Sequence, residues 1–300
     1  MNTSLLMPPE GIVDVVLDTD AFNEVDDQFA IAYLLRSDDR LHTVAIYAAP
    51  FENARSTGPA DGMQKSYDEI HHILDLCGRS AYKDRVFKGS EAFLYDEIHP
   101  VDSPAARDLA DRAMGYTQEN PLYIVAIGAI TNIASAILLN PEIKNRIVVV
   151  WLGGHAHHWR NTEEFNMKQD YCAARVVMRC GAAFVQLPCH GVVSEFRTTI
   201  PEMNYWLAGK NPLADYLARN TIAYGDKYAD MPWSKVIWDV TAVAWLLNKN
   251  ERFMYHRITN VRLPSTSGIY EDEIDHPICY VYGLKRNDLF KDLFDKILNI

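Results

Sequence analysis

The sequence has few cysteines, and their spacing excludes two common uses of this residue. The chain of 300 residues contains five of them and no C-x-x-C pair: Cys77, Cys172, Cys180, Cys189 and Cys279. An odd and scattered set favours neither a disulfide framework nor a thiolate zinc site, and it fits a reducing compartment. The N-terminus also lacks the basic segment and the long apolar segment of a signal peptide. We therefore expect a cytoplasmic protein.

Positive charge is in deficit, and long apolar runs are missing. The chain has 29 lysines and arginines against 40 aspartates and glutamates, which gives a formal net charge of −11. Such a field repels polyanions, so we expect no nucleic-acid partner, and small neutral substrates or bound cations fit better. The longest apolar stretch, residues 123–139, is interrupted by Gly128, Thr131 and Asn132, so it is too broken to span a membrane. We expect no membrane partner.

What the sequence does contain is an alternation of short β-branched runs and helical patterns. The expected strands are Val13–Leu17, Thr43–Tyr47, Tyr123–Ile127, Ile147–Leu152 and Ala183–Leu187. The expected helices between them are Asp27–Leu35, Tyr67–Leu76, Ala105–Met114, Asn132–Leu139 and Tyr171–Cys180. Continuous apolar strands separated by helices predict a Rossmann-like α/β fold, in which helices flank an open, mainly parallel sheet.

The pattern becomes more helical after Pro188. We expect helices over Pro201–Ala208, Leu213–Tyr228 and Trp238–Leu247, strands over Phe253–Leu263 and Pro277–Tyr282, and a last helix over Asn287–Leu298. No repeat, low-complexity tract or Gly/Ser linker separates this portion from the rest. The sequence therefore predicts a single α/β domain over residues 1–300 with a more helical C-terminal portion.

Acidic residues crowd directly after the first expected strand. Residues 17–28 read LDTDAFNEVDDQ and include Asp18, Asp20, Asp26 and Asp27. The carboxyl ends of strands are where open α/β sheets bind ligands. So many like charges in one place are costly unless a cation compensates them, and Ca²⁺ accepts six to eight oxygen ligands. The blander alternative is that Asp26 caps the next helix while the other acids are solvated.

A second interpretation of the same acids is a phosphotransfer site. Asp18-Thr19-Asp20 after a strand resembles the motif of haloacid-dehalogenase-like hydrolases, which use one Asp as nucleophile and the other as acid and base. That motif expects Thr or Val where this chain has Phe22, and it does not require Asp26 and Asp27. The resemblance implies a Mg²⁺-dependent phosphohydrolase.

Four segments between residues 18 and 239 resemble, in the same order, the inosine–uridine-preferring nucleoside hydrolase family. Asp18-Thr19-Asp20 with Asp26-Asp27 is similar to D-x-D-P-G-x-D-D, although residues 21–25 add two positions. AIGAITNIA at 126–134 is similar to G-P-L-T-N-I-A. Gly153-Gly154 with Glu164-Phe165-Asn166 and Asp170 resembles G-G…E-F-N…D, and Trp238-Asp239 stands where many members have His-Asp. The resemblance implies an α/β nucleoside N-ribohydrolase.

The resemblance also implies a set of site residues. It implies Ca²⁺ held by three side chains and one backbone carbonyl, those of Asp20, Asp27, Asp239 and Thr131. The side chains expected to hold the ribose hydroxyls are Asp26, Asn161, Glu164 and Asn166. Calcium lowers the pKa of its bound water, and Asp20 is the candidate base that takes the proton.

Trp238 is the main departure from the family. An indole cannot protonate a leaving base, so its expected catalytic role is to stack on the base, which gives a slight lean to purine nucleosides. Packing in the core is the equal alternative for this residue. His155, His157 and His158 form a second cluster that could hold a metal or, with Trp159, line the base pocket, and His190 is a weaker candidate.

Two further expectations concern the sugar site and assembly. Ala48-Ala49-Pro50-Phe51 stands where the family typically has A-G-N, which removes a candidate ribose-binding asparagine. A homo-oligomer, dimer or tetramer, is expected by analogy with the family. The alternative from another class is a non-catalytic nucleoside- or ribose-binding relative, motivated by the missing His and opposed by the retained Asp20.

Overall fold

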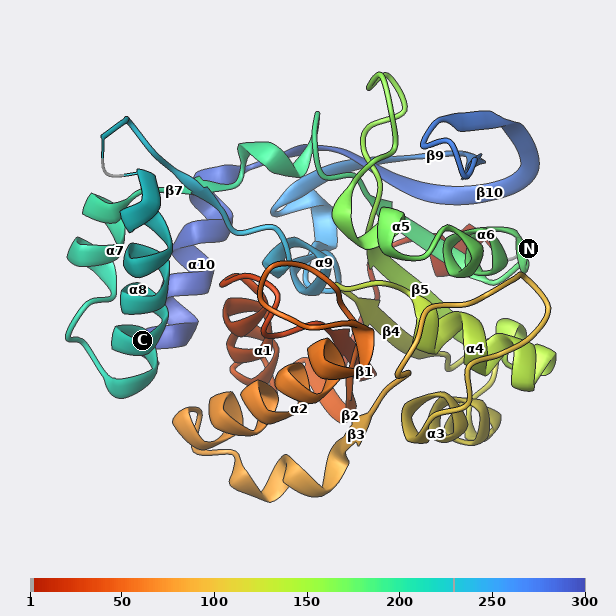
Figure 1. Ribbon diagram of the computed structural model, residues 1–300, viewed down its shortest axis with the longest axis horizontal. Coiled ribbons are helices and arrows are strands. Elements are labelled where there is room, and N and C mark those ends of the chain that lie inside the picture. Colours follow the sequence, from red (N-terminus) through yellow and green to blue (C-terminus); the bar gives the residue numbers. More distant parts are fainter. Residues whose placement is uncertain (1–2, 229, 300) are drawn as a thin grey trace.

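An eight-stranded sheet ordered β3-β2-β1-β4-β5-β6-β10-β9 forms the centre of the computed structural model, which describes residues 3–228 and 230–299 (Figure 1). Its strands are β1 (Val13–Thr19), β2 (Leu41–Ala48), β3 (Val86–Lys88), β4 (Leu122–Ala126), β5 (Ile147–Leu152), β6 (Ala183–Leu187), β9 (Met254–Pro264) and β10 (Tyr270–Leu284). Each neighbouring pair is parallel except β9 with β10. The predicted open, mainly parallel α/β sheet is confirmed.

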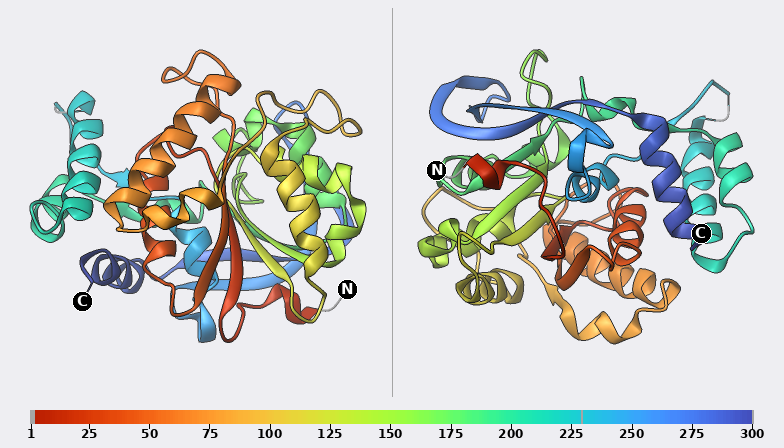
Figure 2. Two further views of the ribbon diagram at one scale, coloured as in Figure 1. Left: turned by 90° about the horizontal axis from the view of Figure 1, so that it is seen from below. Right: turned by 180° about the vertical axis from the view of Figure 1, so that it is seen from behind.

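Helices cover both faces of this sheet (Figure 2). They are α1 (Asp27–Leu35), α2 (Pro59–Leu76), α3 (Pro104–Arg112), α4 (Thr131–Leu139), α5 (Phe165–Gln169), α6 (Tyr171–Arg179), α7 (Ile200–Trp206), α8 (Pro212–Gly225), α9 (Val240–Trp245) and α10 (Arg286–Leu298). Alternate residues of one strand enter different cores: Val15 and Leu17 of β1 pack with α1, α2 and α9, whereas Val16 packs with α3, α4 and α6. In the described residues, no helix is both long and apolar enough for a bilayer.

Several element boundaries differ from those expected. Strand β3 and helix α5 were not predicted, because three and five residues are too short to give a periodic pattern. Helix α2 begins at Pro59 rather than at Tyr67. Helix α9 begins at Val240, so Trp238 precedes it and Asp239 is its N-cap residue. The short antiparallel pair β7 (Arg197–Thr198) and β8 (Lys235–Val236) was also missed.

The strand order creates a switch point between β1 and β4. From β1 the chain moves outward to β2 and β3, and it then returns to the other side of β1 to form β4. Asp20 follows β1, and Ile127 follows β4 at the same edge of the sheet. A Cβ at Gly128 would lie 3.1 Å from Asp20 Cγ and 3.0 Å from Ala49 Cβ, so a larger residue would crowd these loops. Open α/β sheets bind ligands in such crevices.

Asn132 holds the two sides of this switch point together. Its Nδ2 donates to Asp18 Oδ1 at 2.7 Å and to the Ala48 carbonyl at 3.3 Å. Its Oδ1 accepts from the Ser90 backbone N–H at 2.7 Å and from the Ser90 hydroxyl at 2.9 Å. The Asn132 side chain is fully buried, so no water is at hand to replace it as the hydrogen-bond partner of Asp18, Ala48 and Ser90.

Replacing Asn132 by Ala is expected to lower the free energy of unfolding by at least about 2 kcal/mol, because buried groups of Asp18 and Ser90 lose their partner. Urea unfolding measures the loss, and Asn145→Ala, at an exposed asparagine, is the matched control. Equal stability of the two variants would contradict the role assigned to Asn132.

Candidate active site

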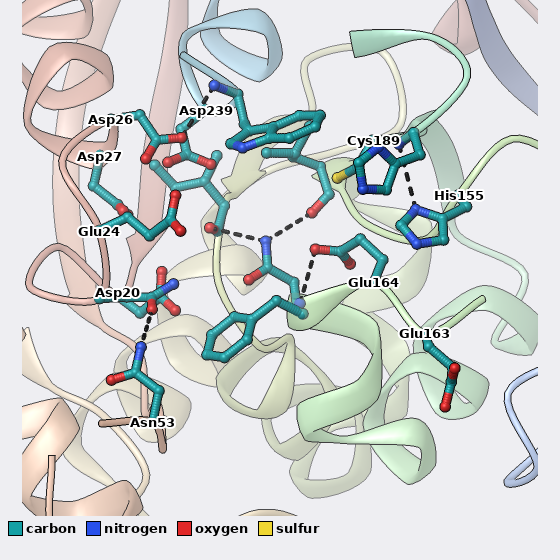
Figure 3. A pocket seen from close by; sticks show the side chains of 17 residues that line it. Asp20, Glu24, Asp26, Asp27, Asn53, His155, Glu163, Glu164, Cys189 and Asp239 are labelled. Carbon is teal, nitrogen blue, oxygen red and sulfur yellow. Dashed lines mark hydrogen bonds between the residues drawn. The ribbon is translucent and has the colours of Figure 1, made fainter. Parts of the chain in front are cut away.

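A cavity of about 450 Å³ lies where the loops after β1, β4, β5 and β6 meet. Its lining residues are mostly acidic, amide or aromatic: Asp20, Asn23, Glu24, Asp26, Asp27, Asn53, Ile127, Leu152, His155, Glu163, Glu164, Phe165, Asn166, Cys189, His190, Trp238 and Asp239. Figure 3 shows Asp20, Asp26, Asp27 and Asp239 on one side, with Cys189 and His155 on the other. The cavity thus has an acidic side and a histidine-bearing side.

The acidic side gathers carboxylates from three parts of the chain. Oxygens of Asp26, Asp27 and Asp239 lie within 4.8 Å of one another. Both carboxylate oxygens of Asp20 are buried and have no hydrogen-bond partner among the described residues. Asp26 precedes α1 but makes no side-chain cap, so the helix-cap alternative for this residue is wrong.

The pKa values of this cluster are raised. Burial, followed by repulsion from Asp26, raises the pKa of Asp27 to about 7, although a 2.6 Å hydrogen bond from the Thr19 hydroxyl opposes the shift. Burial and neighbouring carboxylates also raise the pKa values of Asp20 and Asp239 well above their ordinary range. These carboxylates resist ionisation together, which a bound cation would relieve.

The donor set fits a hard divalent cation. Carboxylate and carbonyl oxygens are the ligands that Ca²⁺ takes in proteins. The Asp20 oxygens have no hydrogen-bond partner in the part of the chain that the structure describes, so this side chain is available as a ligand. Ile127 also lines the cavity, and its main-chain carbonyl accepts a hydrogen bond at 3.1 Å from Asn166 Nδ2, another lining residue. The cluster can therefore supply both kinds of ligand.

Thr131, the expected carbonyl ligand, does not line the cavity. It is the first residue of α4, where a backbone carbonyl points along the helix toward the next turn. Its hydroxyl donates to Asp170 Oδ2 at 2.8 Å. Ile127, which directly follows β4 and lies four residues earlier, does line the cavity, so the motif position that lines it differs from the expected one.

Lys235 supplies a positive charge beside the acidic cluster. Its Nζ lies 3.2 Å from Asp26 Oδ1 and forms a short ion pair with Glu24, which also accepts from the Tyr224 hydroxyl at 3.0 Å. Burial alone would lower the pKa of Lys235, but Asp26 and Glu24 hold it above its usual range. One lysine therefore neutralises part of the charge that the carboxylates bring together, a role that sequence spacing did not reveal.

Glu164 and Asn166, two of the residues expected at the ribose, both line the cavity. Glu164 Oε2 accepts from the backbone N–H groups of Gly154 at 2.9 Å and Met167 at 3.0 Å, and burial raises the pKa of Glu164 despite them. Asn166 Nδ2 donates to Ile127 and to the Leu152 carbonyl, each at 3.1 Å. Both side chains are thereby fixed at the cavity wall.

Asn161 lies outside the lining, and other residues contribute instead. Its Oδ1 accepts from the Glu163 backbone N–H at 3.3 Å, and Glu163 is the residue of that loop that lines the cavity. Asn53, beyond the segment in which the family asparagine is missing, also lines it and donates to Asn23 Oδ1 at 2.6 Å. The sequence shows this asparagine two residues after Phe51, but it does not show that the loop brings Asn53 to the cavity.

The opposite side of the cavity is aromatic. The ring of His190 stacks on Trp159 with centroids 5.6 Å apart and meets Trp238 edge-on at 5.5 Å. Trp238 donates its backbone N–H to Asp26 Oδ2 at 3.0 Å. It both lines the cavity and packs against the core, so the two alternatives for this residue hold together.

Strand β10 fixes the loop that carries the neighbouring histidines. The Tyr270 hydroxyl donates to the His155 carbonyl at 2.8 Å, and the His157 backbone N–H donates to the Tyr280 hydroxyl at 3.0 Å. The His157 ring packs on these two tyrosines, whereas His155 faces the cavity. The three loop histidines do not converge, and the described residues contain no metal-binding group of histidines.

The fold and this cavity define an α/β protein with an acid cluster suited to a divalent cation at a sheet switch point. The family model described as inosine-uridine preferring nucleoside hydrolase matches residues 15–274. The chain belongs to this family, and it is therefore an enzyme of the nucleoside hydrolase class. The predicted resemblance is confirmed.

Individual relatives are distant. The pyrimidine-specific ribonucleoside hydrolase RihA of Escherichia coli is 23% identical over 237 residues, which cover 70% of this chain and 76% of that protein. A plant nucleoside hydrolase, PpNRh1, has a TM-score of 0.75 at 18% identity, covering 96% of this chain and 99% of that one. A purine-preferring ribonucleoside hydrolase from Gardnerella vaginalis has a TM-score of 0.74 at 22% identity, covering 95% and 98%. At these identities the structural likeness supports the fold.

Stability of the metal-free protein is expected to fall as pH rises. The pKa of Asp27 is about 7 in the folded chain against an ordinary 3.8, so the folded state holds its proton more strongly. The free energy of unfolding therefore decreases as pH rises through this interval, and the loss is complete above it. Melting temperatures in chelator between about pH 5 and pH 8 measure the effect.

A divalent cation that binds these carboxylates is expected to raise the melting temperature more at the upper end of this range, since it competes with protons for the same oxygens. Asp27→Asn should flatten the pH dependence in chelator, whereas Asp111→Asn, at an exposed site, should not. A wild-type protein that gains stability steadily with pH in chelator would contradict this account.

Proposed function

We propose that the chain hydrolyses the N-glycosidic bond of ribonucleosides to free base and ribose, in a Ca²⁺-dependent reaction. The observation that carries the proposal is the buried cluster of Asp20, Asp26, Asp27 and Asp239 in a cavity at the switch point of a nucleoside hydrolase. A ribose offers hydroxyls to these carboxylates, and a cation satisfies their charge.

The sugar and the base would occupy different sides of the cavity. Asp26, Glu164 and Asn166 are the proposed ribose-binding side chains, because all three line the cavity and are fixed by hydrogen bonds. Asn53 replaces Asn161 in this proposal, since only Asn53 reaches the cavity. Carboxylate and amide oxygens around the sugar would stabilise positive charge on the ribosyl group as the bond breaks.

Asp20 is the proposed general base. Its two oxygens have no hydrogen-bond partner among the described residues, which leaves them available to accept a proton from water. Asp20, Asp27, Asp239 and the Ile127 carbonyl would hold the cation. When bound, Ca²⁺ supplies positive charge that makes a nearby water easier to deprotonate.

A lean to purine nucleosides is part of the proposal. The Trp238 ring is available to stack on a base, and a larger base offers it more surface. The relatives point both ways, since one is named pyrimidine-specific and another purine-preferring. The preference for purine or pyrimidine nucleosides therefore depends on this chain's own aromatic residue at the cavity, Trp238.

Ribose release from inosine, adenosine, guanosine, uridine and cytidine tests the reaction. We expect release from at least one purine nucleoside, loss of release in chelator, and recovery with Ca²⁺. Recovery with Mg²⁺ alone, together with phosphate release from phosphate esters, would favour the phosphohydrolase interpretation. Nucleoside binding by calorimetry without ribose release would favour the non-catalytic relative.

Asp20→Asn is expected to lower kcat by roughly 10²- to 10⁴-fold, the usual contribution of a general base. Asp14→Asn is the matched control, because Asp14 lies on β1, the strand that Asp20 follows, but pairs with His42 and does not line the cavity. Comparable kcat values for the two variants would exclude Asp20 as the base.

We also propose a homo-oligomer, dimer or tetramer. On α7, Tyr205 and Trp206 expose large apolar surface that a second copy could cover. Light scattering on the purified chain measures the assembly, and a monomeric mass at working concentration would contradict this proposal.

A further inference from the structure

The chain lacks the histidine that precedes the last aspartate in many relatives, yet another histidine reaches the same cavity. His190 follows β6 and lines the cavity. Its ring packs against the Trp238 ring in a T-shaped arrangement, with an angle of 88° between the two ring planes. Its side chain is exposed rather than sealed in the core. Its ring nitrogens have no hydrogen-bond partner among the described residues, so they are free to contact a ligand.

The position of His190 matches the side of the cavity that a base would fill. Cys189, its neighbour in the chain, lies opposite the carboxylates in Figure 3. A ribose held at the carboxylates would leave the part of the cavity lined by Trp238 and His190 for its base. Trp159 stacks on the imidazole at an interplanar angle of 17°, which limits the ring's rotation.

Backbone contacts hold His190 in this place. Its N–H donates to His155 Nδ1 at 3.3 Å, and its carbonyl accepts from the Ala156 N–H at 2.9 Å. Burial and repulsion from His190 lower the pKa of His155 to about 4, so this imidazole is largely unprotonated near neutral pH, and its Nδ1 already accepts from the His190 N–H. His155 is better placed to position the loop.

We propose that His190 is the catalytic acid that protonates the leaving base, an inference that rests on the proposed nucleoside hydrolysis. As the C1′–N bond breaks, its electron pair leaves with the base and a base nitrogen takes the proton from the His190 imidazolium. The water oxygen bonds to C1′, and its proton passes to Asp20. Transfer of that proton to His190 through solvent restores the enzyme, so the net reaction consumes one water.

The acid strength of His190 suits this role. Partial burial and the positive charge of Arg197 lower its pKa below the ordinary value for histidine. A protonated imidazole with a lowered pKa gives up its proton more readily than free imidazolium, although a smaller fraction is protonated at neutral pH.

The test compares two leaving groups. A purine nucleoside needs a proton on its base, whereas 4-nitrophenyl β-D-ribofuranoside releases a phenolate that is stable without one. His190→Gln is expected to lower kcat/KM for the nucleoside by roughly 10²-fold or more, with a loss at least roughly tenfold smaller on the nitrophenyl riboside. A residue that only maintains the cavity would affect both substrates alike.

His158→Asn is the matched control, since His158 is an exposed histidine of a neighbouring loop and does not line this cavity. His190→Asn serves as a second variant, and melting temperatures check that each variant folds. Equal losses on the two substrates, or no loss on either, would overturn the assignment. A wild-type protein inactive on both substrates would instead overturn the proposed hydrolysis, and this inference with it.

Discussion

Mutual repulsion of buried carboxylates is the interaction on which the rest of this structure depends. Asp20, Asp26, Asp27 and Asp239 are almost completely excluded from solvent, which makes their charges costly. The protein offsets only part of that cost, through the Thr19 hydroxyl and the ammonium group of Lys235. The remaining negative charge suits this cavity to a cation and, in the proposed function, to the polar groups of a sugar.

The sheet explains why this arrangement persists in spite of its cost. Rigid strands end on both sides of the switch point, and Asn132 ties Asp18 to the neighbouring loops. Large cores on both faces of the sheet fix the strand ends. The folding free energy gained in those cores is therefore available to hold the acids together before any ligand binds.

The sequence was most informative where the site residues lie next to a strand in the chain. The acids at residues 18–27 follow a strand directly, so their common location was predictable from the chain alone. Asn53 and Lys235 were not predictable, because each reaches the site through a loop or strand distant in sequence. The difference between Thr131 and Ile127 has another cause: a motif fixes which residues are present, whereas only the path of the turn decides which carbonyl faces the cavity.

The contacts of strand β10 have a consequence for how such a cavity can change during evolution. Tyr270 and Tyr280 hold the loop that carries His155 on the side proposed for the base, while residues after β1 and β4 build the side proposed for the sugar. In this proposal, separate parts of the sheet serve the two halves of a ligand. Substitutions along β10 can reshape the pocket for a new base and leave the ribose-binding chemistry intact, which allows selectivity to drift while the reaction is conserved.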